Sequence, residues 1–393
     1  MKHCFAVAFA LLVAFPLLAQ NEEGPAQVKG VAVDTTGKGY TAAYVIETST
    51  GRVLFEENAN VSLPTASMAK MMTALITMEE IRDGRLKLDT PVTISARASR
   101  MGGSQIYAKD GQVFSVQTLL AAVMIQSAND AAEALAEKIA GSAENFADVM
   151  NQRAKQMGLT QSTFHDPHGL PNSQNPDQID KMSAHDLAIL GKELMKDPLM
   201  REYAKTATMP FTNGTFTSGL TNPNHLINPH KVNYFDAATG IKTGYSAPAG
   251  YCVTAAAQRG DMELVCVVMG ASRASGATSS FGIASKLMSQ AFAQYSLATV
   301  VKKGSPVGQA PVKDGNTKAV AAVAAADAKA LVKRGEERRV KVVFNPAPVT
   351  APVSAGQPVG TIIVQEAGNI VKVPAIAAVA VAKQPWWKMF WPF

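Results

Sequence analysis

Residues 64–81 of this chain read PTASMAKMMTALITMEEI, and they decide how the rest of the sequence is interpreted. After its first residue the segment contains neither proline nor glycine, so it predicts a buried helix that ends at Gly84. Ser67 and Lys70 are three positions apart and therefore share one face of the first turn. A serine becomes a nucleophile when a base removes its proton, and a buried lysine can be that base. Taken alone, this spacing more often means a capping serine and a surface lysine.

A second motif lies at a break between two predicted helices. Ser127 and Asn129 follow an apolar helical stretch, residues 116–125, and precede a helix that starts at Asp130. Such residues usually cap a helix. The alternative is that the hydroxyl relays a proton and the amide holds a substrate carbonyl.

The third motif is the tripeptide Lys242, Thr243 and Gly244. On a strand beside a cleft it presents a cation and a hydroxyl, and we expect Gly244 to let a ligand approach the backbone. Residues 250–257 and 263–269 predict a hairpin behind it. An isolated Lys-Thr-Gly is usually no more than part of an edge strand. In this order, however, the three motifs have the contexts that a serine-lysine acyl-transfer site requires.

Composition and charge exclude several classes of protein. The chain has 393 residues, of which 47% are hydrophobic and 17% are charged, so it is neither disordered nor a polytopic membrane protein. Three cysteines are too few for a disulfide scaffold. The net charge of +6 has no focus in the sequence and gives no indication of nucleic-acid binding.

The two ends of the chain carry targeting signals. Residues 1–19 carry a lysine at position 2, continue as an apolar run shorter than a membrane span and end at a small residue, which predicts a secretory signal peptide. An uncleaved anchor is the alternative. Residues 384–393 contain all three tryptophans and predict an amphipathic aromatic tail at the membrane interface. Docking of the tail on its own domain is the alternative. We therefore expect an exported protein, peripheral on the periplasmic face of the cytoplasmic membrane.

Two domains are expected between these ends. Residues 28–295 mix helical and strand periodicities, whereas residues 300–382 are rich in Val, Ala, Pro and Gly and predict a small β domain. The alanine-rich stretch 318–333 has helical propensity, but its valines and flanking glycines favour strands. Asn345 and Pro346 predict a turn.

The three motifs resemble those of the low-molecular-weight penicillin-binding proteins of the D-alanyl-D-alanine carboxypeptidase type. Residues 164–170 and 222–228 and the β-rich segment 351–360 add to the resemblance, which covers nearly the whole chain after residue 28. It implies an α/β (α+β) transpeptidase-like domain, similar to β-lactamases, with a central antiparallel sheet flanked by helices and followed by a small all-β domain. Ala128 and Tyr245 depart from the residues common in the family, and Tyr245 could alter substrate preference.

The resemblance also implies a mechanism. Ser67 would attack the carbonyl between the last two D-alanines of a peptidoglycan stem pentapeptide, Lys70 would act as base, and Ser127 would return a proton to the leaving amine. Lys242 and Thr243 would bind the terminal carboxylate. Asn129 would bind the peptide portion, and Gly244 and Tyr245 would be further substrate-binding positions. The N–H groups of Ser67 and Tyr245 would together form the oxyanion hole. Penicillins and other β-lactams would acylate Ser67, and neither a metal nor an organic cofactor would be required.

Three other functions stay open at this stage. An endopeptidase that cuts cross-links would use the same residues. A serine β-lactamase would need a carboxylate that drives deacylation, for which Glu144 and Asp166 are the nearest candidates. A non-catalytic wall-binding protein would not depend on Ser67. Separately, Cys252 and Cys266 on the predicted hairpin could be either a cross-strand disulfide or buried free thiols.

Overall fold

The computed structural model describes residues 39–385 except 172–174, 176–177, 215–216, 337–339 and 367–368. The expected signal peptide, residues 1–19, and residues 386–393 of the expected tail lie outside the described residues. Within the described part of the chain, no helix has the length and apolar character that crossing a membrane requires.

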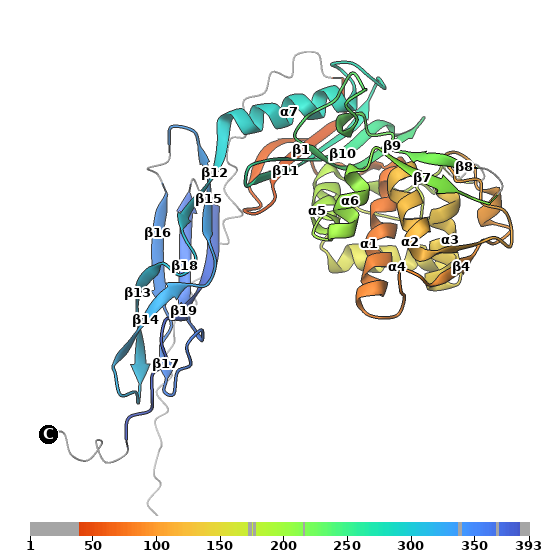
Figure 1. Cartoon of the computed structure of the whole chain (residues 1–393). Coiled ribbons are helices and arrows are strands. Elements are labelled where there is room, and N and C mark those ends of the chain that lie inside the picture. Colours follow the sequence, from red (N-terminus) through yellow and green to blue (C-terminus); the bar gives the residue numbers. More distant parts are fainter. Residues whose placement is uncertain are drawn as a thin grey trace, which may run out of the picture.

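A five-stranded antiparallel sheet forms the centre of the N-terminal unit (Figure 1). Its order is β2-β1-β11-β10-β9. The two strands from the start of the described chain pair with each other, and β1 also pairs with β11, which lies about 200 residues later in the sequence. The strands are β1 (Ala42–Glu47), β2 (Val53–Glu57), β9 (Ala238–Ser246), β10 (Gly250–Arg259) and β11 (Met262–Ala271). The predicted hairpin is confirmed as β10 and β11, and β9 is an edge strand.

Both faces of this sheet are covered, because successive residues of the inner strands enter different hydrophobic clusters. Cys252 belongs to the cluster on one face and Cys266 to the cluster on the other. The register of the hairpin, unbroken from its turn to Val253, also places Cys266 opposite Ala255. The two thiols therefore cannot pair across the hairpin; both are free and buried, which decides between the two alternatives that the sequence left open.

Helices cover the two faces unequally. On one face α7 packs against β10 and β11, and α5 and the remaining helices lie on the other. The helices are α1 (Lys70–Arg82), α2 (Val116–Ala121), α3 (Asn129–Ala140), α4 (Ala143–Gln156), α5 (Ala184–Leu194), α6 (Pro198–Lys205) and α7 (Ser280–Gln294). Shorter helical turns are η1 (Ala66–Ala69), η2 (Ala98–Arg100), η3 (Ala122–Gln126) and η4 (His225–Ile227). Three two-stranded ribbons complete the unit: β3 (Leu63–Pro64) with β6 (Lys181–Met182), β4 (Pro91–Thr93) with β5 (Val113–Ser115), and β7 (Thr208–Thr212) with β8 (Thr217–Thr221).

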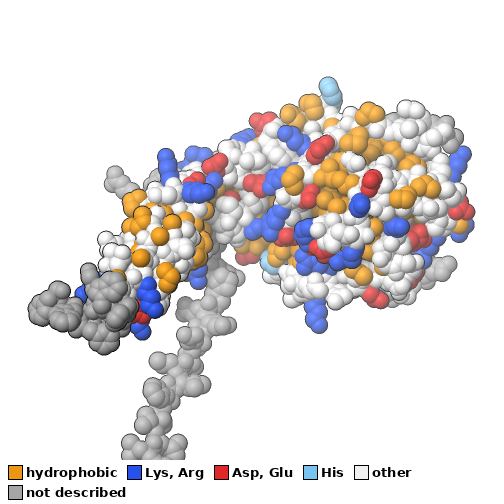
Figure 2. All heavy atoms as spheres, turned by 60° about the horizontal axis from the view of Figure 1, so that its bottom comes forward, with side chains coloured by type: hydrophobic (Ala, Val, Ile, Leu, Met, Phe, Trp, Pro, Cys, Tyr) orange, Lys and Arg blue, Asp and Glu red, His pale blue; other side chains and the backbone are white. Residues whose placement is uncertain are grey.

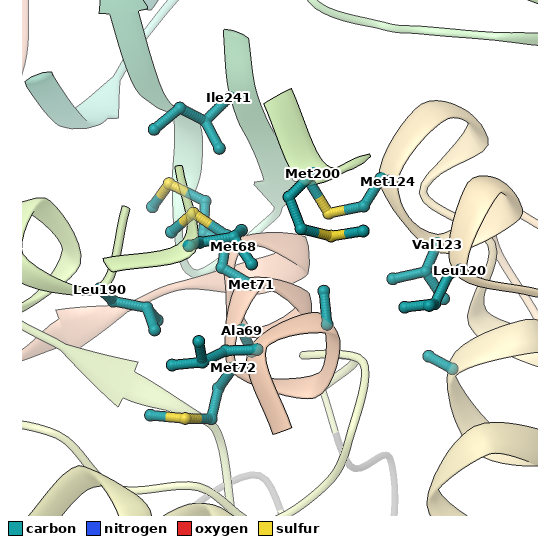
Figure 3. Packing of buried hydrophobic residues seen from close by; sticks show 14 of the residues in the cluster. Met68, Ala69, Met71, Met72, Leu120, Val123, Met124, Leu190, Met200 and Ile241 are labelled. Atoms are coloured by element: carbon teal, nitrogen blue, oxygen red, sulfur yellow. The ribbon is translucent and has the colours of Figure 1, made fainter. Parts of the chain in front are cut away.

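Helix α1 lies in the middle of the larger core. Met68, Met71 and Met72 are completely buried and pack among residues of other helices and of β9 (Figure 3). The predicted helix after residue 64 is thus confirmed, and its end at Gly84, with φ +76°, has the left-handed geometry that a C-terminal glycine provides. A helix buried on this scale holds its first turn rigidly, and that turn carries Ser67.

The C-terminal unit consists of strands. They are β12 (Tyr295–Val301), β13 (Pro306–Lys313), β14 (Ala319–Ala324), β15 (Ala328–Lys333), β16 (Lys341–Pro346), β17 (Val349–Thr350), β18 (Pro358–Glu366) and β19 (Asn369–Ala377). The alanine-rich stretch forms β14 and β15, as its valines predict. The turn predicted at Asn345 and Pro346 is wrong: both residues pair with β18 at the end of β16, an edge strand, where a missing N–H is tolerated.

The two units meet through α7, which leads directly into β12 (Figure 1). Arg52 of the N-terminal unit is buried at this junction, where it donates to the Leu331 carbonyl at 2.9 Å and pairs with Glu366. Its guanidinium also lies 5.0 Å from the centre of the Tyr295 ring. At the other end of the β unit, the Gln384 N–H donates to the Asp314 carbonyl, and the described chain ends there, away from the N-terminal unit (Figure 1).

Charged side chains of both signs are interspersed on the face shown in Figure 2, which agrees with the modest net charge. Hydrophobic side chains also reach the surface of the β unit, among them Val342, Val343 and Ile370.

Candidate active site

The first motif is assembled at the start of α1. Ser67 lies in η1, and Lys70 is the first residue of α1. The Lys70 side chain is fully buried, and its Nζ lies 2.8 Å from Ser67 Oγ. Ala66, next to Ser67, has φ +46°, a left-handed conformation that non-glycine residues rarely adopt and that is found at functional sites.

The second and third motifs are bound to each other. Lys242 of β9 donates from Nζ to Ser127 Oγ at 2.7 Å, so Ser127 is linked to this lysine. Ser127 follows η3 with φ +62°, and this backbone conformation ends the helix and turns the hydroxyl toward β9. Each serine thus has its own lysine partner.

Burial determines the protonation of both amines. It lowers the pKa of Lys70 to about 7, although the negative charges of Asp166, Asp180 and Asp130 act to raise it. Burial, together with the nearby Lys70, holds the pKa of Lys242 well below its usual range. Lys70 is therefore able to accept a proton near neutral pH, as a general base must.

A loop that the sequence did not assign to the site holds Lys70 in place. The backbone carbonyl of His168 accepts a hydrogen bond from Lys70 Nζ at 2.8 Å. Asp166 fixes this carbonyl, because its Oδ1 accepts from the backbone N–H of His168 and of Gly169 at 2.8 and 2.6 Å. Burial raises the pKa of Asp166, but these hydrogen bonds and the contact with the His168 ring outweigh it and lower the pKa. The contact to Lys70 comes from a carbonyl, which has no residue signature in a sequence.

Two glycines allow chain segments to close around Ala66. Gly169 has φ +78°, and a Cβ on it would lie 2.0 Å from the Ala66 carbonyl oxygen. A Cβ on Gly244 would lie 2.6 Å from the Thr65 carbonyl oxygen and 3.3 Å from Ala66 Cβ. The missing side chain of Gly244 thus lets β9 approach the turn that carries Ser67. Gly244 also lines the cavity described below, and the room it leaves for a ligand stays a prediction.

Gly244→Ala should misplace Ser67, since backbone atoms rather than a flexible side chain occupy the space that the methyl group needs. We expect acylation of Ser67 by a penicillin to slow about 100-fold, the order of loss that a displacement near 1 Å produces. Stopped-flow measurement of the acylation rate checks this. Gly219→Ala is the matched control, because the nearest atom to its Cβ is 3.6 Å away; equal rates for the two variants would contradict the role given to Gly244.

Asn129 is held at the site by the segment before it. Its Nδ2 donates to the Gly102 carbonyl at 2.6 Å, and its backbone N–H donates to the Ser104 carbonyl at 2.7 Å. Its Oδ1 is buried and has no hydrogen-bond partner within the described structure, so it is free to accept from a bound ligand. We expected Asn129 to hold a substrate carbonyl, which requires a hydrogen-bond donor. Its free atom is instead the oxygen, an acceptor, which would suit a substrate N–H.

These residues surround one cavity of about 450 Å³. Most of the predicted site residues line it, whereas Lys70 and Lys242 lie buried behind the two serines. Its described lining is Ser67, Gly103, Ser104, Ser127, Asn129, Leu170, Pro223, His225, Thr243, Gly244, Tyr245, Tyr251, Cys252, Ala274, Ser280 and Phe281. The sequence did not predict the aromatic side of this cavity, which Tyr251, His225 and Phe281 provide. The site thus combines a serine hydroxyl beside a buried amine, a second hydroxyl bound to another amine, and a free amide oxygen. These are the parts that an acyl-transfer site requires.

Comparison with known families agrees with this chemistry. A family model described as D-alanyl-D-alanine carboxypeptidase matches residues 29–273, and one described as penicillin-binding protein 5, C-terminal domain, matches residues 295–383. The chain belongs to the D-alanyl-D-alanine carboxypeptidase family. Membership confirms the expected serine-type carboxypeptidase, and the α+β fold with its central antiparallel sheet and following all-β unit is likewise confirmed.

Individual relatives extend along most of the chain. It is 33% identical to the D-alanyl-D-alanine carboxypeptidase DacF of Bacillus subtilis over 94% of its own length and 92% of the relative. Among solved structures, it is similar to a peptidoglycan synthesis regulatory factor, PBP3, of Streptococcus pneumoniae, with a TM-score of 0.78 and 26% identity over 87% of this chain and 99% of the other. It is also similar to penicillin-binding protein D2 of Listeria monocytogenes in the ampicillin-bound form, with a TM-score of 0.56 and 29% identity over 65% and 98% of the two chains.

The alternatives gain no comparable support. A D-alanyl-D-alanine endopeptidase of Pseudomonas aeruginosa is 31% identical, but only over 54% of this chain and 65% of that one. The carboxylates considered for a β-lactamase are engaged elsewhere: Glu144 pairs with Arg97 at 2.6 Å, and Asp166 closes the turn at His168. Neither lines the described cavity around Ser67.

Proposed function

We propose that Ser67, Lys70 and Ser127 catalyse removal of the terminal D-alanine from peptidoglycan stem pentapeptides through an acyl-enzyme. The proposal rests above all on the 2.8 Å contact of Ser67 Oγ with a buried amine, in a cavity that also contains a second lysine-bound serine. Family membership supplies the substrate class.

Acylation begins when Lys70 Nζ takes the proton of Ser67 Oγ, which attacks the carbonyl between the two D-alanines. The N–H groups of Ser67 and Tyr245 stabilise the oxyanion, each by about 3 kcal/mol. Tyr245 is suited to this role because β9 is an edge strand, in which alternate N–H groups point away from the sheet. Ser127, bound to Lys242, passes a proton to the leaving amine, and water then hydrolyses the ester.

The terminal carboxylate binds to Lys242 and Thr243. Thr243 lines the cavity, and Lys242 lies directly behind Ser127. Burial lowers the pKa of Lys242, and the negative charge of an arriving carboxylate opposes this by favouring the protonated amine. Gly244 contributes through its close approach to the turn at Ser67, and Asn129 binds the peptide.

Product analysis tests this function directly. A soluble peptide ending in D-Ala-D-Ala should lose one D-alanine, and a penicillin should inhibit this and become attached to Ser67. Release from a cross-linked dimer that is faster than release from the linear pentapeptide would instead favour the endopeptidase. Binding to cell wall with no product from either peptide would favour a non-catalytic protein.

The rate of acylation should depend on pH through Lys70. Only the neutral amine can accept the serine proton, so the rate should rise about tenfold per pH unit below pH 7 and level off above it. Stopped-flow acylation by a fluorescent penicillin between pH 5 and 9 measures this profile. A rate that is flat across pH 7 would contradict Lys70 as the base.

We further propose the following organisation: a signal peptide at 1–19, a catalytic domain at 28–295, a β domain at 300–382 and an interfacial tail at 384–393. Members of this family act on peptidoglycan outside the cytoplasm. The finer proposal is peripheral attachment by the tail to the periplasmic face of the cytoplasmic membrane, with the β domain as a stand-off. Deleting residues 384–393 should release the protein from membranes without changing cleavage of a soluble peptide. Complete retention on membranes would refute attachment by the tail.

A further inference from the structure

Two tyrosines at the edge of the sheet form one side of the cavity. Tyr245 of β9 and Tyr251 of β10 are directly opposite each other, and their rings stack with centroids 4.4 Å apart and planes 26° apart. Both line the cavity that contains Ser67. Tyr245 is nevertheless 61% exposed, so much of its side chain stays accessible to a ligand in the cavity.

The direction of β9 determines which part of a substrate reaches these rings. Thr243 and Tyr245 are two positions apart on the strand, so they share a face about 7 Å apart, and both line the cavity. The proposed function places the substrate carboxylate at Thr243 and the reacting carbonyl beside the N–H of Tyr245. The acyl portion, which stays on Ser67, therefore continues past Tyr245 and over the tyrosine pair.

The surroundings of the pair suit an uncharged group. None of the described residues that line this cavity is Asp, Glu, Lys or Arg. Tyr245 and Tyr251 add two aromatic rings to this lining. Aromatic rings contribute contact area and stacking, and the described lining contains no carboxylate that would pair with a cation.

We infer that Tyr245 and Tyr251 form a specificity-determining platform that favours an apolar, and above all an aromatic, group on the acyl side of the scissile bond. This inference rests on the proposed function, since it takes the orientation of the substrate from it. The platform contacts the acyl portion of the substrate. This portion is already bound when Ser67 attacks, so the platform affects the rate of acylation.

Two penicillins that differ only in the acyl group test the platform. Benzylpenicillin carries a phenylacetyl group, and 6-aminopenicillanic acid carries a free amine on the same bicyclic nucleus. The measured quantity is the ratio of their second-order acylation constants at Ser67. We expect Tyr245→Ala and Tyr251→Ala each to lower this ratio about tenfold, as loss of one ring contact of about 1.4 kcal/mol would.

Matched variants separate the ring from other effects. Tyr245→Phe keeps the ring and should keep the ratio of the wild type. Tyr234→Ala removes an exposed tyrosine that does not line the cavity and should leave the ratio unchanged. If both alanine variants are acylated and the ratio of the two acylation constants stays unchanged, the platform is refuted while the proposed function stands. Failure of both penicillins to acylate the wild type would overturn the proposed function and the platform with it.

Discussion

Ser67→Ala should abolish covalent labelling by a penicillin and reduce D-alanine release by about 10⁴- to 10⁶-fold, the range seen when a catalytic nucleophile is removed. The loss is this large because no ester can form without Oγ, while the rest of the cavity is left unchanged. The fold should be retained, since Ser67 is only partly buried and, within the described structure, its hydroxyl forms a hydrogen bond with Lys70 alone. Labelling followed by gel electrophoresis, together with product analysis, measures both effects.

Ser104→Ala is the matched control for this experiment. Ser104 lines the same cavity, but its hydroxyl donates to the Gln126 carbonyl at 2.6 Å and has no lysine partner. Stoichiometric labelling should therefore persist in Ser104→Ala. A covalent adduct that maps to any residue other than Ser67 would remove Ser67 from the role of nucleophile.

Lys70→Met should separate catalysis from stability. Methionine keeps an unbranched side chain in a fully buried position but cannot accept a proton, so we expect acylation to slow about 10³-fold, within the range of general-base effects. The measurement is the acylation rate at pH 8, where Lys70 of the wild type is mostly neutral. Retention of more than a tenth of the wild-type rate would contradict its assignment as base.

The same substitution should not destabilise the protein. The pKa of Lys70 falls from 10.5 to about 7 on folding, so the unfolded chain binds the proton more tightly and the buried amine costs free energy below pH 10.5. That cost approaches its full value, on the order of 5 kcal/mol, as the pH falls through 7. Lys70→Met removes this cost and so raises the free energy of unfolding. Part of that increase is lost because the His168 carbonyl no longer receives a hydrogen bond.

Thermal unfolding at pH 7 tests this second expectation. The first transition of Lys70→Met should lie at or above that of the wild type, and Lys155→Met, an exposed replacement on α4, provides the comparison. A lower melting temperature for Lys70→Met would show that the buried amine stabilises the fold through its contacts.

The elements that carry the motifs could be predicted because their signals are local. The apolar run after residue 64 and the glycine that closes it predict α1, and alternation around a tight turn predicts the β10–β11 hairpin. The turn expected at Asn345 and Pro346 failed for a nonlocal reason: pairing with β18 at a sheet edge satisfies the backbone there. The cysteine pairing could not be decided either, since it depends on the register of the hairpin and on the face of the sheet that each side chain enters.

By itself, the sequence determined which side chains could do the chemistry, because Ser67, Lys70, Ser127 and Lys242 stand in short motifs whose helical and strand contexts are local. Only the tertiary structure decided how they are paired and held. It assigned Ser127 to Lys242, brought the His168 carbonyl to Lys70, and gave Gly244 a packing role. Those contacts join segments about 100 to 180 residues apart, and two of the three involve backbone atoms, which every residue type shares. No pattern of side chains can therefore predict them.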